Sequence, residues 1–281
     1  MREIPGTGAA DVTSPYGYGG PAGRGEGESF YRAYGDWAAA EGIVTTFIRF
    51  HPLLENYRLA ASFVMLERVA DTASWRLSPD RDLRAGMHQM HRRGVRKAER
   101  LGVEVTIERS PGRRREFVSL YEQAMRRAGA AAYYIFPDGY WDALFALGET
   151  LVRLDARHEG RLLASQLHFA SPPWLHYHLG AASDEGFATG ASKLLFLRAA
   201  EWGREEGLAE LHLGSGLGGR EDSLWLSKQR FSPADKRPFF LGKLVHDRDR
   251  YTELTGGRTP TDGFFPAYRA GSPLGRTEAL G

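Results

Sequence analysis

Apolar residues along this chain repeat with two periods, and the alternation of the two predicts a mixed α/β protein. In Ser29–Glu41, the spacing of Phe30, Tyr34 and Trp37 predicts a helix, which Gly42 ends. The same spacing predicts helices at Asp82–Leu101, Glu116–Ala128, Pro137–Leu147 and Thr189–Glu206. Period-two or β-branched runs predict strands at Ile43–Phe50, Phe63–Ala70, Val103–Glu108, Leu151–Arg157, Arg161–Ala170, Trp174–Ala181 and Leu211–Leu213.

The order of these elements predicts two α/β units in tandem, with a boundary where the composition changes at Ser110–Arg115. We therefore expect a first domain over residues 1–109 and a second domain over residues 110–254. The opening thirty residues are rich in glycine and read as a loop. The glycine- and proline-rich residues 255–281 read as a flexible tail.

One stretch imitates a membrane span, because Leu162–Ser183 contains 22 residues without a formal charge. Its apolar residues alternate and it contains Pro172-Pro173, so the pattern favours a β-hairpin that turns at the prolines. The N-terminus has no apolar run of the kind found in signal peptides. We therefore expect a cytoplasmic protein without a membrane span.

Composition excludes several classes of chemistry. The chain has no cysteine, which removes disulfides, thiolate metal sites and cysteine nucleophiles. Lys and Arg number 37 against 35 Asp and Glu, so the net charge alone does not indicate a nucleic-acid-binding protein. With 42% hydrophobic residues, the chain can build a sizeable core.

The predicted helix at Asp82–Leu101 concentrates positive charge. Arg93, Arg96, Lys97 and Arg100 follow one another at helical spacing and share a face, and Glu99 is the only acidic residue among them. Such a stripe suits the phosphates of a nucleic acid or a diphosphate. An ordinary solvated helix face is the alternative.

Three histidines cluster in the predicted hairpin. His176 and His178 share a face of one predicted strand, and His168 lies on the preceding strand of the same hairpin. Three histidines are able to bind zinc, but no carboxylate accompanies them, so a role in lining a substrate groove is favoured over a metal site.

Two further segments carry possible binding groups. Phe187–Ser192 matches the diphosphate loop of coenzyme A-dependent acyltransferases only at Gly190. After a glycine-rich stretch, Lys228 and Arg230 lie among aromatic residues, where a cation is able to stabilise a developing oxyanion.

Together, these segments resemble the Fem-like branch of the GNAT acyltransferase superfamily, and they occur in that family's order over most of the chain. The motifs are Ser14–Pro21 (SPYGYGGP), Phe47–Pro52 (FIRFHP), Arg92–Ala98 (RRGVRKA), Tyr177–Gly180 (YHLG), Gly190–Leu195 (GASKLL) and Asp222–Pro233 (DSLWLSKQRFSP).

The resemblance implies tandem GNAT-like domains with the active site in the second domain and no metal or other cofactor. It further implies transfer of an amino acid from aminoacyl-tRNA to an amine of a peptidoglycan precursor or of a peptide-like or nucleoside natural product. Lys228 matches the family's lysine in a Phe-Lys-x-x-Phe-like segment, although Ser227 replaces the first aromatic residue.

From the residues and the resemblance together, we expect catalytic roles for Lys228, Tyr177 and His178. The residues expected to bind substrate are Tyr16, Tyr18, Arg49, His51, Arg92, Arg96, Lys97, Ser192, Lys193, Ser215 and Arg230. The Gly214–Gly219 loop is expected to assist at the reacting carbonyl.

The sequence departs from the family at its start. The family's first domain has about half a domain more before the SPYGYGGP segment, so we expect a truncated start or a smaller first domain covered by a partner chain. Two other functions stay open: an acyltransferase that uses acetyl-coenzyme A, and a non-catalytic scaffold that binds anions.

Overall fold

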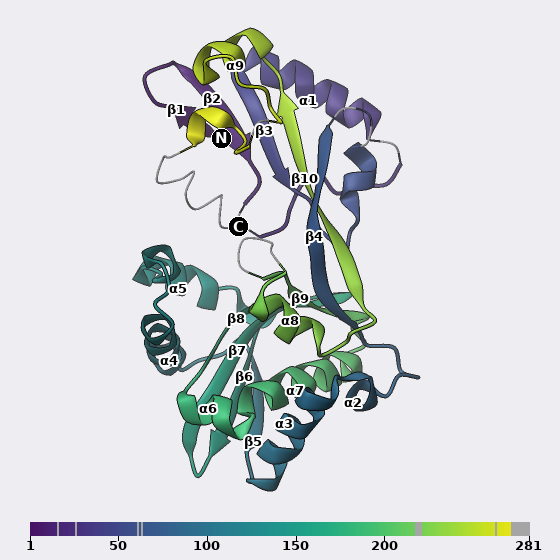
Figure 1. The fold of residues 1–281 in the computed structure, drawn as a ribbon, viewed down its shortest axis with the longest axis vertical. Helices are drawn as coiled ribbons and strands as arrows, with labels where there is room; N and C mark the ends of the chain where they lie inside the picture. Colours follow the sequence, from purple (N-terminus) through teal and green to yellow (C-terminus); the bar gives the residue numbers. More distant parts are fainter. Residues whose placement is uncertain are drawn as a thin grey trace. The chain divides into compact units, whose positions relative to one another are not determined.

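The computed structural model describes residues 1–270 except 16, 26, 61, 63, 217–220 and 262. Within that part the fold is mixed α/β, as the sequence predicts, and the chain divides into two compact units (Figure 1). Unit 1 comprises Met1–Thr72, Ser215–Asp222 and Arg237–Gly281, and unit 2 comprises Ala73–Gly214 and Ser223–Lys236. Residues 73–109, which we assigned to the first domain, thus lie in unit 2.

Unit 1 contains a sheet with one apolar cluster on each face. Its strands, in spatial order, are β1 (Arg2–Ile4), β2 (Ala9–Thr13), β3 (Ile43–Arg49), β10 (Lys236–Val245) and the first part of β4 (Met65–Arg76). Tyr31 of α1 (Glu28–Ala40) and Ala60 of the 3₁₀ helix η1 (Asn56–Ala60) belong to one cluster. Tyr251 of α9 (Arg248–Thr255) belongs to the other, and the 3₁₀ helix η5 (Ala267–Arg269) follows.

Unit 2 has a sheet in which only one neighbouring pair of strands is parallel. The spatial order runs from the end of β4 through β9 (Glu210–Gly214), β8 (Trp174–Ala182), β7 (Arg161–Ser171), β6 (Leu151–His158) and β5 (Glu104–Arg109). β8 and β9 are parallel, and the other neighbours are antiparallel. The segment Leu162–Ser183 forms the predicted hairpin of β7 and β8, and no described helix is long and apolar enough to cross a membrane.

Helices cover both faces of this sheet. One face packs against α2 (Leu83–Gly86), α3 (Gln89–Arg100), α7 (Ala191–Glu205) and the segment that follows α8 (Ser223–Gln229). The opposite face packs against α4 (Arg114–Arg127) and α5 (Asp138–Phe145). Short helices α6 (Asp184–Thr189), η2 (Ala132–Tyr134) and η3 (Gly148–Thr150) connect these elements.

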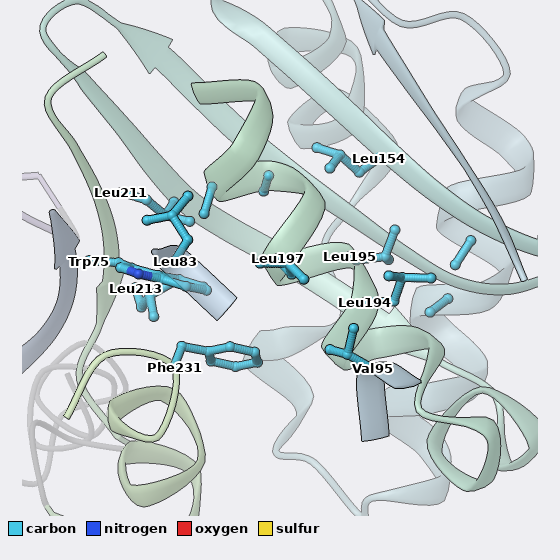
Figure 2. Close-up of a cluster of buried hydrophobic side chains, with 14 of the residues drawn as sticks. Trp75, Leu83, Val95, Leu154, Leu194, Leu195, Leu197, Leu211, Leu213 and Phe231 are labelled. Carbon is cyan, nitrogen blue, oxygen red and sulfur yellow. The ribbon is translucent and has the colours of Figure 1, made fainter. Parts of the chain in front are cut away.

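The larger core of unit 2 surrounds α7. Its leucines Leu194, Leu195 and Leu197 project among side chains of neighbouring elements, which include Trp75, Leu211 and Phe231 (Figure 2). All of these side chains are at most 2% exposed. Because removing a buried side chain of this size costs about 2–5 kcal/mol, the elements that contribute them are held firmly to one another.

Several elements differ from the sequence prediction. The helix expected at Asp82–Leu101 is divided into α2 and α3, because Met87 and His88 are extended and the His88 side chain accepts a hydrogen bond from Met90 N as the N-cap of α3. The opening segment, expected as a loop, contains β1 and β2. Helices α8 and α9 and strand β10 are not predicted from the sequence, because each of them is short or lacks a clear apolar period.

Candidate active site

Helix α8 carries Lys228 in its last turn, and two buried aromatic residues anchor this part of the chain. Trp225 within the helix is 4% exposed, and Phe231 just beyond it is 2% exposed. Lys228 lies between these two anchors and is half-buried. The backbone position of Lys228 is therefore set by the core rather than by a free loop.

The Lys228 ammonium lies over an aromatic ring. Its Nζ atom is 5.5 Å from the centroid of the Tyr177 ring of β8. The Tyr177 ring also lies next to Phe196 of α7, at 4.9 Å between centroids, and to His168 of β7, at 5.6 Å. A cation over a ring face is stabilised by the ring quadrupole, by up to about 2 kcal/mol when desolvated.

A β-bulge places Tyr177 at a distinctive point of the sheet. Leu179 pairs with Leu167 and Tyr177 pairs with His168, so His178 is an extra residue without a partner in the register. On the other side, β8 pairs with β9 only over Trp174–His176, so Tyr177 is the first residue beyond that pairing. Lys228 and Tyr177 thus meet where the parallel pairing of β8 and β9 ends.

The Tyr177 hydroxyl lies over Gly180, where a Cβ atom would come within 2.7 Å of it. Burial raises the pKa of Tyr177 to about 12, so the hydroxyl stays protonated at neutral pH. It is able to donate a hydrogen bond to a ligand, but it is not a general base.

His178 points to the opposite face of the sheet. Its Nε2 atom is 2.6 Å from the Tyr140 hydroxyl of α5, and its ring packs on Phe169 at 4.5 Å. Burial lowers the pKa of His178 to about 4. His178 and Tyr177 were both expected to act in catalysis, but the two side chains lie on opposite faces of the sheet, because neighbouring residues of a strand project to different faces.

His168 is also removed from solvent. It is fully buried, its Nε2 atom is 3.1 Å from Gln166 Oε1, and burial together with the charges of His178 and His176 lowers its pKa to about 3. No group of three or more metal-binding side chains is arranged as a site within the described part of the chain.

The basic residues of α3 are of two kinds, those that bond to backbone carbonyls and those that are exposed. Arg92 Nη1 donates to the carbonyl oxygens of Ala85 and Met87, at 2.8 and 2.6 Å, and Lys97 Nζ donates to Ala188 O at 2.7 Å. Arg93 and Arg96 are exposed, and neither side chain bonds to a described residue. The expected roles of Arg92 and Lys97 in binding phosphate therefore compete with structural roles, whereas Arg96 is accessible.

Helix α3 crosses the beginning of α7 at a contact between two glycines. A Cβ atom on Gly190 would lie 2.9 Å from the carbonyl carbon of Gly94, and one on Gly94 would lie 2.6 Å from Lys193 Cδ. The side chain of the half-buried Lys193 forms no hydrogen bond or ion pair with the described residues, whereas its backbone N–H donates to Gly190 O at 3.0 Å. The Arg230 side chain likewise has no such bond to a described residue, and the Arg230 backbone carbonyl oxygen accepts from His88 N at 2.8 Å. Ser192 accepts a hydrogen bond from Gln166 through its own carbonyl, at 3.4 Å.

The remaining expected site residues belong to unit 1. Tyr18 and His51 lie together, with 6.0 Å between ring centroids, and burial lowers the pKa of His51. Arg49 is 4% exposed and its guanidinium lies over Phe47. Ser215 follows β9 and is half-buried. Tyr16 and residues 217–219 of the Gly214–Gly219 loop lie outside the described residues.

One residue near Lys228 was not singled out from the sequence. His91 of α3 is 2% exposed, and its Nε2 atom lies 2.8 Å from the carbonyl oxygen of Ser227. The signal for its burial is nonetheless in the sequence, because His91 shares a helix face with the buried Val95 and Ala98 at i+4 and i+7.

Comparisons with known proteins agree with this architecture. Residues 85–222 match the family model described as an acetyltransferase (GNAT) domain. Across 81% of this chain and 78% of its own, the crystal structure of FemX superposes with a TM-score of 0.59 at 14% identity. L-PGS from Bacillus licheniformis gives a TM-score of 0.55 at 15% identity, over 82% of this chain and 78% of its own.

A third structure, of a conserved protein of unknown function from Bacteroides thetaiotaomicron, gives a TM-score of 0.57 at 12% identity over 79% of this chain and 77% of its own. No curated protein matches the sequence. At these identities the structural likeness concerns the fold, and the family model supplies the chemistry. Residues 85–222 of this chain are therefore a GNAT acyltransferase domain, and the fold of the chain is similar to the folds of FemX and L-PGS.

Proposed function

We propose that this enzyme transfers an amino acid from aminoacyl-tRNA to the amine of a peptidoglycan precursor or of a peptide-like or nucleoside natural product. The observation that carries the proposal is the Lys228 ammonium, held 5.5 Å over the Tyr177 ring where the pairing of β8 with β9 ends. A fixed cation at a half-buried position suits a reaction whose transition state carries negative charge on oxygen.

The ester of an aminoacyl-tRNA is already activated, so the enzyme has to align two substrates and stabilise charge. The acceptor amine attacks the ester carbonyl carbon, and the carbonyl oxygen becomes an oxyanion that faces Lys228 Nζ. When the intermediate collapses, the C–N bond remains and the bond to the ribose oxygen breaks. The proton lost by the amine passes to that ribose oxygen, so atoms and charge balance.

Substrate assistance supplies this proton transfer in the proposal. Tyr177, with its pKa raised to about 12 by burial, is protonated and unsuited to act as the base. Burial lowers the pKa of His178 to about 4, which makes it a weak base, and it lies on the other face of the sheet, against Tyr140. A neighbouring hydroxyl of the ribose is suited to relay the proton.

The exposed arginines of α3 are suited to bind the phosphates of the tRNA. Arg93 and Arg96 lie on one helix and project to solvent without bonds to described residues. We propose that they contact phosphates of the tRNA, because each such contact releases counterions and strengthens binding at low salt.

An acyl-coenzyme A donor is the second candidate. It is favoured by the first turn of α7, where Gly190 provides no side-chain cap, since an uncapped helix N-terminus attracts a diphosphate. The close packing of Gly94 on Gly190 counts against it, because α3 occupies the space in front of that turn.

The test compares donors in parallel at one salt concentration. Purified protein is mixed with a labelled pool of aminoacyl-tRNAs, with uncharged tRNA or with acetyl-coenzyme A, and binding and transfer to amine acceptors are measured. Lys228→Met is the test variant, and Lys236→Met is its matched control, because Lys236 also lies over a ring, 5.0 Å from the centroid of Trp225.

We expect binding and transfer with aminoacyl-tRNA, a loss of about 10²–10³ in kcat for Lys228→Met, and a change within about twofold for Lys236→Met. Saturable binding of acetyl-coenzyme A without tRNA binding would replace the proposal by the second candidate. Ligand binding without transfer, unaffected by Lys228→Met, would identify a non-catalytic scaffold.

A further inference from the structure

Two hydrogen bonds join the beginning of α3 to the end of α8. The His91 side chain bonds through Nε2 to the carbonyl oxygen of Ser227, at 2.8 Å, and the His88 backbone N–H donates to the carbonyl oxygen of Arg230, at 2.8 Å. The two acceptors flank Lys228 in the sequence. The first turn of α3 thus holds the chain on both sides of the proposed catalytic lysine.

The end of α8 needs such partners, because the last four backbone carbonyls of a helix receive no hydrogen bond from an N–H group of the same helix. Arg230 N donates to Leu226 O at 3.2 Å, and Phe231 N donates to Lys228 O at 3.1 Å. The Ser227 carbonyl lies between these two and is satisfied by His91 from a different helix. A buried carbonyl left without a donor destabilises its local conformation, so this contact helps to determine where the last turn of α8 ends.

The surroundings of His91 make it a neutral donor. Its ring packs on Phe231 with 4.4 Å between centroids, and it is 2% exposed. Burial is the main cause that lowers the pKa of His91 to about 4, and the nearby charges of Lys193, Arg230 and His88 also lower it. The hydrogen bond to Ser227 acts in the opposite direction and raises the pKa, but by less than burial lowers it.

The acceptor determines the tautomer of His91. A carbonyl accepts only, so the Nε2 atom carries the proton in the neutral ring. The Nδ1 atom is then an unprotonated acceptor, and it is buried without a partner among the described residues. Leucine or phenylalanine would fill this space without leaving a polar atom unpaired. What histidine adds at this position is therefore the Nε2–H group that donates to the Ser227 carbonyl.

We propose that His91 is a positioning residue for Lys228, and that its bond to the Ser227 carbonyl sets the last turn of α8 so that the lysine ammonium lies over Tyr177. The effect of His91 on catalysis rests on the proposed function, which makes Lys228 the catalytic lysine. The mechanical link between His91 and Lys228 is independent of which donor the enzyme uses.

The test uses His91→Phe and His91→Gln in the full chain. Phenylalanine keeps a ring against Phe231 but has no donor. Glutamine carries an N–H donor the same number of bonds from the backbone as His Nε2. His246→Phe is the control, because His246 Nε2 also makes a hydrogen bond, to Thr46 Oγ1 at 3.0 Å, in unit 1.

The first readout is the rate at which acetic anhydride labels Lys228, measured by mass spectrometry relative to Lys236 in the same molecule. We expect the ratio to rise about fivefold in His91→Phe, to return within about twofold of wild type in His91→Gln, and to stay unchanged in His246→Phe. An unchanged ratio in folded His91→Phe, or no recovery in folded His91→Gln, would overturn the proposal.

The second readout is kinetic. His91→Phe should lower kcat by about tenfold with KM for the donor within about twofold, and His91→Gln should recover most of kcat. If labelling changes as expected but no aminoacyl transfer is detected with wild-type enzyme, the proposed function fails while the link between His91 and Lys228 stands.

A third measurement needs no variant and remains decisive if His91→Phe does not fold. A long-range ¹H–¹⁵N spectrum of the wild-type protein at pH 7 should show His91 as the Nε2–H tautomer. The Nδ1–H tautomer at His91 would overturn the proposal, because the Ser227 carbonyl would then receive no proton from the ring.

Discussion

Gly190, at the junction of α6 and α7, provides a sharp test of how α3 and α7 pack. Its φ of +86° lies in the left-handed region, and a Cβ atom there would overlap the carbonyl group of Gly94. The left-handed conformation costs a non-glycine residue about 1–2 kcal/mol. Overpacking against backbone costs about 1–3 kcal/mol more, because a helix backbone yields less readily than a side chain. Gly190→Ala should therefore lower the free energy of unfolding by about 2–5 kcal/mol.

The opposite glycine of the same contact is the matched control. A Cβ atom on Gly94 would meet Lys193 Cδ at 2.6 Å, and that flexible side chain is able to move aside. Alanine in a helix interior is also favoured over glycine by about 1 kcal/mol. Gly94→Ala should therefore change the free energy of unfolding by less than about 1 kcal/mol in either direction.

Urea denaturation followed by tryptophan fluorescence and by circular dichroism measures both variants. For a unit of this size, the loss in Gly190→Ala corresponds to a fall in Tm of roughly 4–20 °C. Equal stabilities of the two variants would refute the reasoning, since the two differ in what the added methyl group meets. A large loss in Gly94→Ala would mean that Lys193 is held rigidly over α3.

Substitutions at four other residues have expected outcomes. Tyr177→Phe keeps the ring face under Lys228 and should retain transfer within about threefold, whereas Tyr177→Leu should lower kcat by about tenfold; equal losses would assign the effect to the hydroxyl. Arg96→Gln should reduce the slope of log Kd for tRNA against log salt by about 0.7–0.9. Arg92→Gln should leave the salt dependence of tRNA binding unchanged and lower Tm instead, because the Arg92 guanidinium bonds to two backbone carbonyls. A reduced slope in Arg92→Gln with a lower Tm in Arg96→Gln would mean that Arg92 binds phosphate and Arg96 is structural. Burial lowers the pKa of His178 from 6.5 to about 4, so its neutral form stabilises the fold above pH 6.5 and this stability is lost as pH falls toward 4. His178→Phe should therefore remove about one proton from the uptake on unfolding between about pH 4.5 and 6.5, measured from urea denaturation across that range, and an unchanged uptake would contradict a neutral buried His178.

Much of the secondary structure is predictable from local pattern. Helices α1, α4 and α5 and the β6–β7–β8 meander lie within a few residues of the predicted ranges, because each has a clear apolar period and a turn residue at its end. The break between α2 and α3 at Met87 was not predicted. The extended backbone of His88 depends on its capping of α3 and on the hydrogen bond from its N–H to Arg230 O, and the local pattern shows neither. Strand β10 was missed because it mixes apolar residues with charge, and its pairing with β3 is long-range.

For the site, the sequence by itself determined which residue types are present and roughly where they lie along the chain. It was sufficient to single out Lys228 and Tyr177, through family order and the aromatic residues around them, and to identify α3 as basic. Their meeting at 5.5 Å was decided by the tertiary structure, because the two residues are 51 positions apart and come together only when α8 packs beside the sheet.

The tertiary structure also decided what each candidate side chain is able to do. His178 bonds to Tyr140 on the face of the sheet opposite to Tyr177, Arg92 and Lys97 bond to carbonyl oxygens at the ends of α2 and α6, and His91 bonds to the Ser227 carbonyl. Periodicity specifies a face of a helix or strand, which is a local property of the backbone. Which partner that face meets, and whether a charge there is exposed or bonded, depends on contacts between segments distant in the chain, and these arise only on folding.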